Sequence, residues 1–313
     1  MEIITKLFEL SPYLELLERK IYFKFIKDKY KTKKYRARHY LHAKITKVDV
    51  DSFILYLKSL GVKKGDLLIV HSSIEGLQAL NCRENQLLDQ LIDLVGEQGT
   101  IALPAFPDES KLKDKNGTKI YDPRRSVAWT GMLPNLMLRK KGAIRSAFPC
   151  NPLVAYGRLA EDMMSQNLET KYAHGKNSCW GYCVEHHAKI LYLGLPAYHS
   201  CTVIHVSEDY QPDFWPANWY MDKKYYVKEQ NELKLIHVKV RDSKWSQYIS
   251  ERYTERKYIR RGFIKEADYC GITIRYIEDS NTFINAILSD WNHLKFFYLS
   301  NRMVNKENGV KKI

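Results

Sequence analysis

The chain has 313 residues and a mass of 36.8 kDa, enough for one large or two small domains with proper cores. Hydrophobic residues make up 45% and charged residues 27%, which excludes a fibrous or largely disordered protein. No apolar stretch reaches the roughly 18 residues of a membrane-spanning helix, and the N-terminus does not resemble a secretory signal. The six cysteines are scattered, as in a protein with reduced thiols. We therefore expect a cytoplasmic protein.

The net charge of +14 is concentrated in one segment. Residues 19–44 contain eleven basic residues and one acidic residue, Asp28, and so carry +10 of that charge. Aromatic residues are interleaved with these bases, among them Tyr22, Phe25 and Tyr35. The rest of the chain carries only +4. The sequence thus predicts a basic N-terminal extension over residues 1–44 and a nearly neutral body over residues 45–313.

The first residues of the extension predict an amphipathic helix. Leu7, Leu10, Leu14 and Leu17 recur at spacings of three and four residues. One interpretation is a helix docked on the main domain with a solvated basic face. A second is peripheral anchoring to an anionic membrane at its inner face. Nucleic-acid binding is a third, but we do not expect it, because no recognised motif accompanies the charge.

After Thr46, strands and helices are predicted in alternation. A helix with Thr46 as its N-cap comes first, and Gly61 follows it as a C-cap. The later elements are strands at 67–73, 100–106, 153–157 and 189–194, and helices at 85–95, 130–139 and from Thr202 to Glu208. Such alternation predicts an α/β fold with a largely parallel central sheet and flanking helices.

From about Tyr220 onward the pattern changes. YYVKE, KLIHVKV and ITIRYI alternate between apolar and polar residues, which predicts antiparallel strands followed by one or two late helices. In open α/β sheets, ligands bind at the carboxyl ends of strands. Polar residues follow four of the predicted strands, at His71–Ser73, at Asp108, at His199–Thr202 and at Asp242. These strand ends are the candidate site.

Five segments occur in the order and spacing of one enzyme family. They read GDLLIVHSSIEGL, GTIALPAF, YDPRRSVAWTGMLPNLMLRKKGAIRSAFP, LVAYG and KILYLGLPAYHSCTVIHVSE. The chain therefore resembles the aminoglycoside 3-N-acetyltransferases, well over roughly residues 45–220 and weakly beyond. The resemblance implies an α/β fold distinct from that of the GNAT acetyltransferases. It also implies transfer of acetyl from acetyl-coenzyme A to an amino group of an amino sugar, without a metal.

The resemblance also implies roles for individual residues. His205 matches the catalytic histidine of the family and Glu208 the acid three residues later. Asp108 and Asp242 fall near acidic positions that orient the histidine or bind substrate. The residues matched to the acetyl-coenzyme A site are His71, Ser72, Ser73, Thr130, Gly131, Arg145, Ser146 and Thr202.

Three features depart from the family pattern. Phe148 stands where the family has a histidine, the basic extension is additional, and the segment after Glu208 is aromatic with only Asp209 and Asp213 as acids. Classical members present several carboxylates to a polycationic drug. We therefore expect an amino sugar of surface-polysaccharide synthesis, carried on a nucleotide or lipid, as the acceptor. An aminoglycoside acceptor, as in antibiotic resistance, is the alternative.

The proposed chemistry suits these residue types. A protonated amine cannot attack a thioester, and a histidine with an ordinary pKa of about 6.5 can accept its proton at neutral pH. A carboxylate on the other ring nitrogen fixes the tautomer, and Ser73 or Thr202 could stabilise the oxyanion.

Other readings remain open at this point. Cys179, Cys183, His186 and His187 could bind zinc, and Cys201 could act as a nucleophile near His205. A catalytically silent relative that binds a membrane or nucleic acid through its basic extension is a third possibility. The oligomeric state is open.

Overall fold

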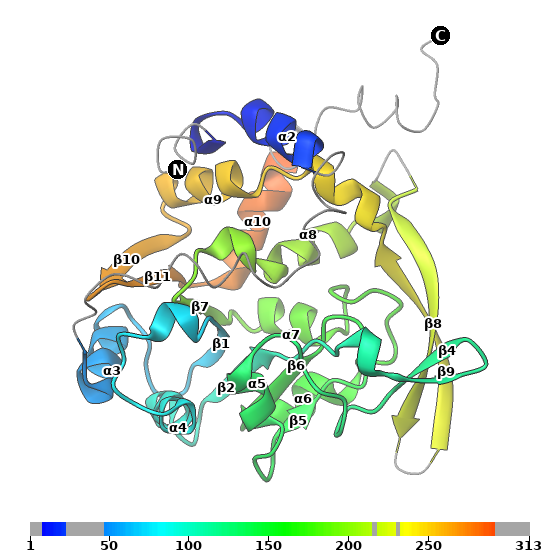
Figure 1. The fold of residues 1–313 in the computed structure, drawn as a ribbon, viewed down its shortest axis with the longest axis horizontal. Coiled ribbons are helices and arrows are strands. Elements are labelled where there is room, and N and C mark those ends of the chain that lie inside the picture. The colour runs from blue at the N-terminus through cyan, green and yellow to red at the C-terminus, as the bar shows by residue number, and fades with distance from the viewer. Residues whose placement is uncertain (1–7, 23–46, 215–217, 230–231, 292–313) are drawn as a thin grey trace.

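The structure is a computed structural model, and it describes residues 8–22, 47–214, 218–229 and 232–291. A seven-stranded sheet forms its centre, in the order β10-β11-β7-β1-β2-β6-β5 (Figure 1). Its strands are β1 (Leu67–Ser72), β2 (Thr100–Pro104), β5 (Ile144–Arg145), β6 (Leu153–Gly157), β7 (Lys189–Leu193), β10 (Lys265–Tyr269) and β11 (Ile272–Ile277).

Only the middle of this sheet is parallel. β1 pairs in parallel with β2 and β7, whereas β6 and β11 pair antiparallel with the outer edges of β2 and β7. β5 and β10 extend the two flanks, also antiparallel. The predicted α/β class is confirmed, with the parallel part confined to three strands. The antiparallel C-terminal portion predicted for ITIRYI is β11.

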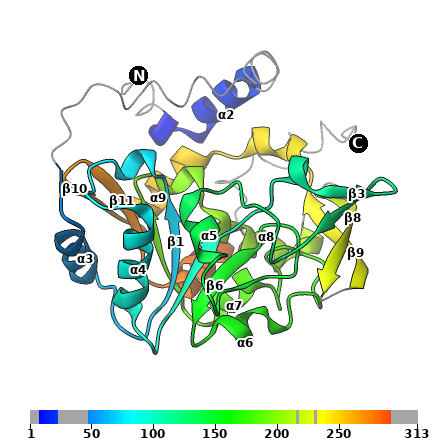
Figure 2. The same ribbon diagram turned by 60° about the horizontal axis from the view of Figure 1, so that its bottom comes forward.

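Helices cover both faces of the central sheet (Figures 1 and 2). They are α2 (Pro12–Ile21), α3 (Val50–Ser59), α4 (Glu84–Val95), α5 (Met132–Met137), α6 (Ala160–Ser165), α7 (Cys179–Glu185), α8 (His205–Asp209), α9 (Glu251–Arg260) and α10 (Ser280–Trp291). Among the described helices, none is long and apolar enough to cross a bilayer.

Two hydrophobic cores result from the alternation of side chains along β1. Leu68 and Val70 pack against α3 and α4, whereas Leu67 and Ile69 point to the opposite core, formed with α7 and α10. A strand that is buried on both faces must be apolar at every position, which accounts for the uninterrupted run LLIV. Burying each such side chain contributes roughly 1.5–3 kcal/mol.

A second sheet stands beside the central one and forms the right-hand side of Figure 1. It has the order β3-β4-β8-β9, with β3 (Lys113–Lys115), β4 (Thr118–Tyr121), β8 (Tyr220–Glu229) and β9 (Glu232–Arg241). Tyr225 and Val238 of the β8–β9 hairpin pack with Leu112, Phe148 and Ala173 in a small third core. This packing fixes the hairpin beside the carboxyl ends of the central strands.

Several predicted boundaries are wrong. The first body helix is capped by Asp49 and not by Thr46, since the Asp49 carboxylate accepts the backbone N–H groups of Asp51 and Ser52 at 2.8 and 3.0 Å. β2 ends at Pro104. α5 begins at Met132 because Gly131, with φ at 128°, occupies the N-cap. The helix predicted from Thr202 starts as a 3₁₀ turn, Thr202–Ile204, and continues as α8.

The N-terminal helix α2 lies against α9 (Figure 2) and docks through its polar face. Glu15 is fully buried, and its carboxylate accepts the backbone N–H groups of Arg252 and Tyr253 at 2.9 and 3.0 Å. These donors belong to the first turn of α9, which has no intrahelical acceptors for them. Arg19 adds an ion pair with Glu251 at 2.9 Å. The predicted end of the extension, at residue 44, lies outside the described residues.

We expect Glu15→Ala to lower the free energy of unfolding by about 1–3 kcal/mol, because two buried N–H groups lose their acceptor. Denaturant titration measures this loss. The control is Glu18→Ala, whose carboxylate is 41% exposed and 3.6 Å from Arg252, and which should cost less than about 1 kcal/mol. Equal effects of the two substitutions would contradict the docking of α2 described here.

Candidate functional site

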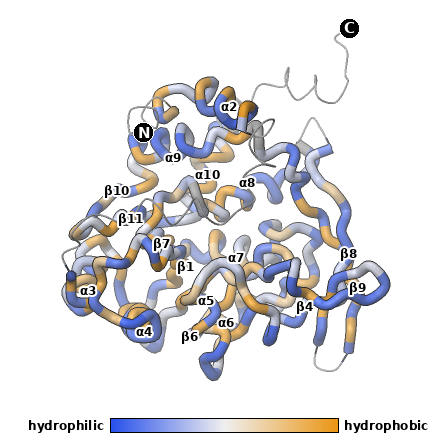
Figure 3. The backbone as a smooth tube through the Cα atoms, viewed as in Figure 1, coloured by the Kyte–Doolittle hydropathy of each residue, from blue (hydrophilic) through white to orange (hydrophobic). Residues whose placement is uncertain are grey.

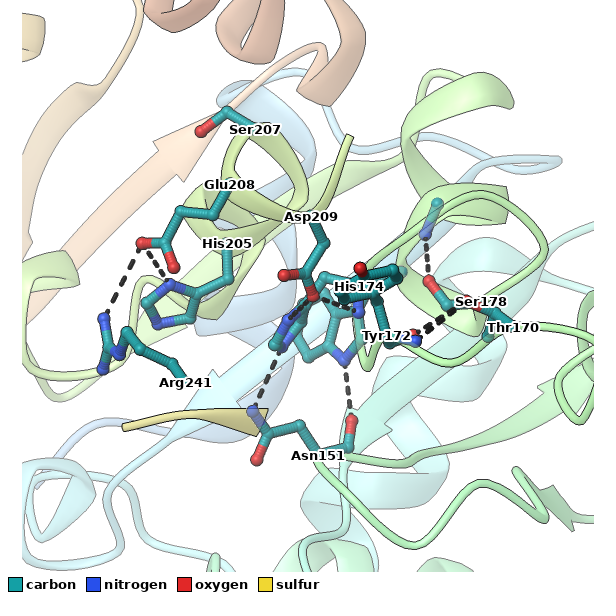
Figure 4. Close-up of polar contacts among 12 residues, drawn as sticks. Asn151, Thr170, Tyr172, His174, Ser178, His205, Ser207, Glu208, Asp209 and Arg241 are labelled. Atoms are coloured by element: carbon teal, nitrogen blue, oxygen red, sulfur yellow. Dashed lines mark hydrogen bonds and ion pairs between the residues drawn. The ribbon is translucent and has the colours of Figure 1, made fainter. Parts of the chain in front are cut away.

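His205 and Glu208 form a hydrogen-bonded pair on α8 (Figure 4). The Nδ1 atom of His205 lies 2.7 Å from Oε1 of Glu208, a carboxylate that is 2% exposed. Three residues separate them, so one turn of helix brings both side chains to the same face. Arg241 of β9 lies 3.7 Å from the same Oε1 atom. A carboxylate on Nδ1 places the ring proton there and leaves Nε2 as the basic nitrogen.

A second histidine–carboxylate pair lies beside the first. His174 Nδ1 is 3.0 Å from Oδ2 of Asp209, which also accepts the His174 backbone N–H at 2.9 Å. Asn151 Nδ2 is 3.1 Å from Nε2 of His174. Burial lowers the pKa of His174, so its ring is neutral at pH 7. The ring centroids of His174 and His205 are 5.2 Å apart. The predicted base therefore has an uncharged imidazole beside it.

Both pairs line a cleft of about 520 Å³ between the central strand ends and the β8–β9 hairpin. Its polar lining carries charges of both signs. The acids are Asp108, Glu109, Glu208 and Asp209, and the bases Lys223, Lys239 and Arg241. Trp129 and Phe106 add aromatic surface, and their rings meet edge to face at 6.1 Å. A polar amine with several hydroxyl groups fits such a lining.

A smaller cavity of about 130 Å³ lies on the other side of α8. His205 and Glu208 line it as they line the cleft, together with Ser200, Cys201 and Thr202. Its remaining walls come from the turn before α8, from Phe283 of α10, from Ile249 and Ile264, and from a mostly polar part of α9 that includes Thr254 and Glu255. The imidazole of His205 therefore borders two cavities.

The other two predicted acids have different surroundings. Asp108 lines the cleft, but its carboxylate is bound by Ser110 and by Lys111 at 3.3 Å, and the hydrogen bond from Ser110 lowers its pKa. Asp242 caps the 3₁₀ helix Ser243–Tyr248 through a bond from the Lys244 backbone at 3.0 Å. The cleft is lined by its neighbours Arg241 and Ser243 and not by Asp242. Of the predicted acids, Glu208 is the one in contact with His205.

His71, Ser72 and Ser73 end β1 next to the end of β7. Ser73 donates its hydroxyl to Glu75 at 2.9 Å, and its backbone N–H to Leu193 at 3.0 Å. The loop after Ser73 packs backbone to backbone on the loop after β7, since a Cβ on Gly76 would collide with the Gly194 carbonyl. None of the three is among the residues lining the two cavities around His205.

Thr130, Gly131, Arg145 and Ser146 shape the loops around the cleft. Thr130 donates its hydroxyl to the Pro104 carbonyl at 2.6 Å. Arg145 is buried and donates to the carbonyls of Ser126 and Ala105, and its guanidinium lies over the Tyr121 ring. The buried Ser146 hydroxyl accepts the Phe148 N–H at 3.1 Å. These side chains therefore hold backbone segments of neighbouring loops together. Contacts of these residues with the coenzyme stay a prediction.

The cysteine alternatives do not gain support from the structure. Burial raises the pKa of Cys201 to about 12, which keeps the thiol protonated and a poor nucleophile. Burial also raises the pKa of Cys179 to about 11. His187 is bound to Asp279 at 2.9 Å. Within the described ranges, no group of three or more metal-ligating side chains is found.

His174, Asn151 and Arg241 were missed by the sequence analysis. His174 lies in a loop 31 positions before His205, with no periodicity or spacing to mark it. Asp209 was noted as one of two acids after Glu208, but its partner is in that distant loop. Arg241 ends a ten-residue strand of alternating pattern. Only the three-dimensional path of the chain brings these side chains to α8.

The buried His71 makes the free energy of unfolding depend on pH. Burial lowers its pKa to about 3, and its ring stacks on Tyr192 at 4.7 Å. In the unfolded chain a histidine takes up its proton near a pH of about 6.5. The stabilisation from His71 is therefore complete above that pH and is lost progressively as the pH falls toward 3.

We expect His71→Phe to reduce the loss of unfolding free energy between pH ~7 and ~5 by roughly 2 kcal/mol. Denaturant titrations at the two pH values measure it. His237→Phe is the control, because His237 is exposed on β9, and it should retain the wild-type pH dependence. If His71→Phe also retains it, the folded protein accommodates a charged His71.

The comparisons with known proteins agree with the fold. The family model for aminoglycoside 3-N-acetyltransferases matches residues 69–280. Aminoglycoside N(3)-acetyltransferase III of Acinetobacter baumannii is 32% identical over 165 residues, which cover 49% of this chain and 57% of that protein. The N(3)-acetyltransferase IX of Micromonospora chalcea is 27% identical over 49% of this chain and 58% of its own length. The matched segment thus spans less than two thirds of the length of each of these two relatives.

Solved structures extend the similarity in fold. AAC-IIIb in a binary complex with CoASH has a TM-score of 0.66 and 22% identity, over 80% of this chain and 98% of that one. AAC-VIa bound to sisomicin has a TM-score of 0.66 and 21% identity, over 80% and 98%. The α/β fold of this chain is therefore that of the aminoglycoside acetyltransferases. Since the family model covers well over half of it, the chain belongs to the aminoglycoside 3-N-acetyltransferase family.

Proposed function

We propose that the protein transfers an acetyl group from acetyl-coenzyme A to an amino group of an aminoglycoside, with His205 as general base. The observation that carries this proposal is the His205–Glu208 pair at the junction of two cavities. The amine and the acetyl thioester can then approach one imidazole from different sides. The intact pair, placed where the His205 imidazole borders both cavities, disfavours a catalytically silent relative.

In this mechanism, Nε2 of His205 takes a proton from the acceptor ammonium, and the freed amine attacks the thioester carbonyl carbon. Glu208 stabilises the imidazolium that forms. Thr202 lines the small cavity beside His205, and its hydroxyl makes only a long bond, 3.4 Å, to the Ser200 carbonyl. We assign it to the oxyanion. When the tetrahedral intermediate collapses, the C–S bond breaks, the attacking nitrogen releases its second proton to solvent in the cleft, and His205 returns the first proton to the leaving thiolate.

The acids of the cleft favour an aminoglycoside as the acceptor. The segment after Glu208 is poor in acids, but Asp108 and Glu109 reach the same cleft from the loop after β2. Glu208 and Asp209 also line the cleft, but they are buried and bound to His205 and His174, so Asp108 and Glu109 are the acids that a polycation would meet. Relatives such as that of Acinetobacter baumannii are named for aminoglycosides, and none supports a role in polysaccharide synthesis. These observations favour the alternative acceptor over our first expectation.

A phosphate-bearing amino sugar remains the second candidate because of the bases in the cleft. Lys223, Lys239 and Arg241 line it from the hairpin. Lys223 is 3.5 Å from Glu109, and Lys239 is 3.2 Å from Asp222. Both of these acidic side chains are exposed to solvent. Exposed pairs of this kind contribute little and can exchange partners. A nucleotide-linked sugar would draw these cations to its phosphates.

We expect His205→Ala to lower kcat by ~10²–10⁴-fold, the usual contribution of a general base. Release of the coenzyme A thiol measures turnover. The control is His186→Ala, since His186 is exposed and bonded to the Tyr182 carbonyl, away from the cleft. Unchanged melting of both variants shows that they are folded. A folded His205→Ala protein with a wild-type kcat would remove His205 from the mechanism.

We expect acetyl-coenzyme A to raise the melting temperature. At 100 times its Kd, the bound coenzyme should add about 2.7 kcal/mol to the free energy of unfolding. No shift at saturating coenzyme would count against the donor.

With acetyl-coenzyme A present, gentamicin and sisomicin should give higher kcat/KM than a nucleotide-linked amino sugar. The reverse ranking would establish the phosphate-bearing acceptor instead.

A further inference from the structure

Hydrophobic and hydrophilic residues alternate along α2 (Figure 3), and its exposed apolar residues form a stripe. Leu10, just before the helix, and Tyr13, Leu14, Leu17 and Ile21 within it are 63, 72, 43, 57 and 48% exposed. At about 100° per residue the four positions within α2 fall within a single arc of about 100°. Scattered exposed apolar residues are normal, but a contiguous patch marks an interaction site.

The orientation of α2 is the reverse of that of an ordinary surface helix, which buries its apolar face. Here Glu15 and Arg19 face the body, where they bind the first turn of α9. Leu16 is the apolar residue of α2 that enters the core. The polar contacts hold the helix in place, so the stripe is not used for docking to the body.

The charge of the sequence identifies what covers the stripe. Residues 19–44, which continue from the end of α2, carry a net charge of +10. A second copy docked on the same stripe would bring two such segments together, and like charges oppose that. An anionic surface is attracted by them, and a lipid surface also takes up apolar side chains. A helix with one apolar face and neighbouring bases is suited to lie in the bilayer interface.

We propose that the apolar stripe of α2 seats the protein on the surface of an anionic lipid bilayer. Leu14 and Leu17 at the centre of the stripe enter the boundary between headgroups and acyl chains. The net charge of +10 over residues 19–44 attracts the protein to anionic headgroups. This inference concerns a surface separate from the cleft and does not depend on the reaction carried out there.

The test is sedimentation of the full-length protein with vesicles of phosphatidylcholine and phosphatidylserine at low salt. Vesicles of phosphatidylcholine alone should bind it weakly. The stripe variant is Leu14→Glu with Leu17→Glu, and we expect at least ~10-fold weaker partitioning because two inserted side chains become charged. The matched control is Leu55→Glu with Leu235→Glu, which changes two leucines of similar exposure, 63 and 44%, on other surfaces.

Binding of wild type and control, but not of the stripe variant, supports the proposal. A neutral variant, Leu14→Gln with Leu17→Gln, should also bind less, and it serves as the test if the glutamate variant does not melt like wild type. Higher salt should weaken binding, since the Debye length falls to about 3 Å at 1 M. Absence of wild-type sedimentation, equal binding by stripe and control variants, or a dimer dissolved by the stripe substitutions would each overturn the proposal. The last result would assign the stripe to a second copy.

Discussion

The hydrogen bond between His205 and Glu208 is the contact on which the proposed chemistry depends. It is made within one turn of α8, so its geometry comes from helical spacing alone. What the fold adds is burial of Glu208, with Arg241 beside it. A carboxylate with few waters around it interacts more strongly with an imidazolium than an exposed one does. The rest of the structure serves to place this short helix at the end of the parallel strands.

His71 and His174 show how burial changes the protonation of a histidine. His71 and His174 are both buried, and burial lowers the pKa of each, so both are neutral at pH 7. His205 keeps a side chain that is 24% exposed, facing two cavities. Only a histidine that can take a proton from a substrate, and lose it again to a product, can act as a base. Exposure to the cavities therefore selects His205 from the three.

The sequence predicted those parts of the fold that rest on local pattern. Uninterrupted apolar runs marked β1 and β7, and three-residue spacing linked His205 to Glu208. It did not predict that β6 runs antiparallel to β2, because apolar runs do not record direction. It also did not reveal His174, whose contact with Asp209 spans 35 positions. Asp108 was predicted as a site acid, but its neighbour Glu109, which lines the same cleft, was not. Arg145 was assigned to the coenzyme. In the structure its guanidinium donates to the backbone carbonyls of Ser126 and Ala105, and a coenzyme contact stays a prediction.

The N-terminal helix shows where periodicity stops being informative. Spacings of three and four residues establish that α2 has an apolar face, but not what that face contacts. Two buried hydrogen bonds to Glu15 and an ion pair from Arg19 decide the orientation. Such contacts have a net value of only about 1–3 kcal/mol each when charged, whereas insertion of the apolar face into the body would bury several large side chains. Docking through these polar contacts leaves the apolar face of α2 exposed, and this is the face that we propose binds an anionic lipid surface.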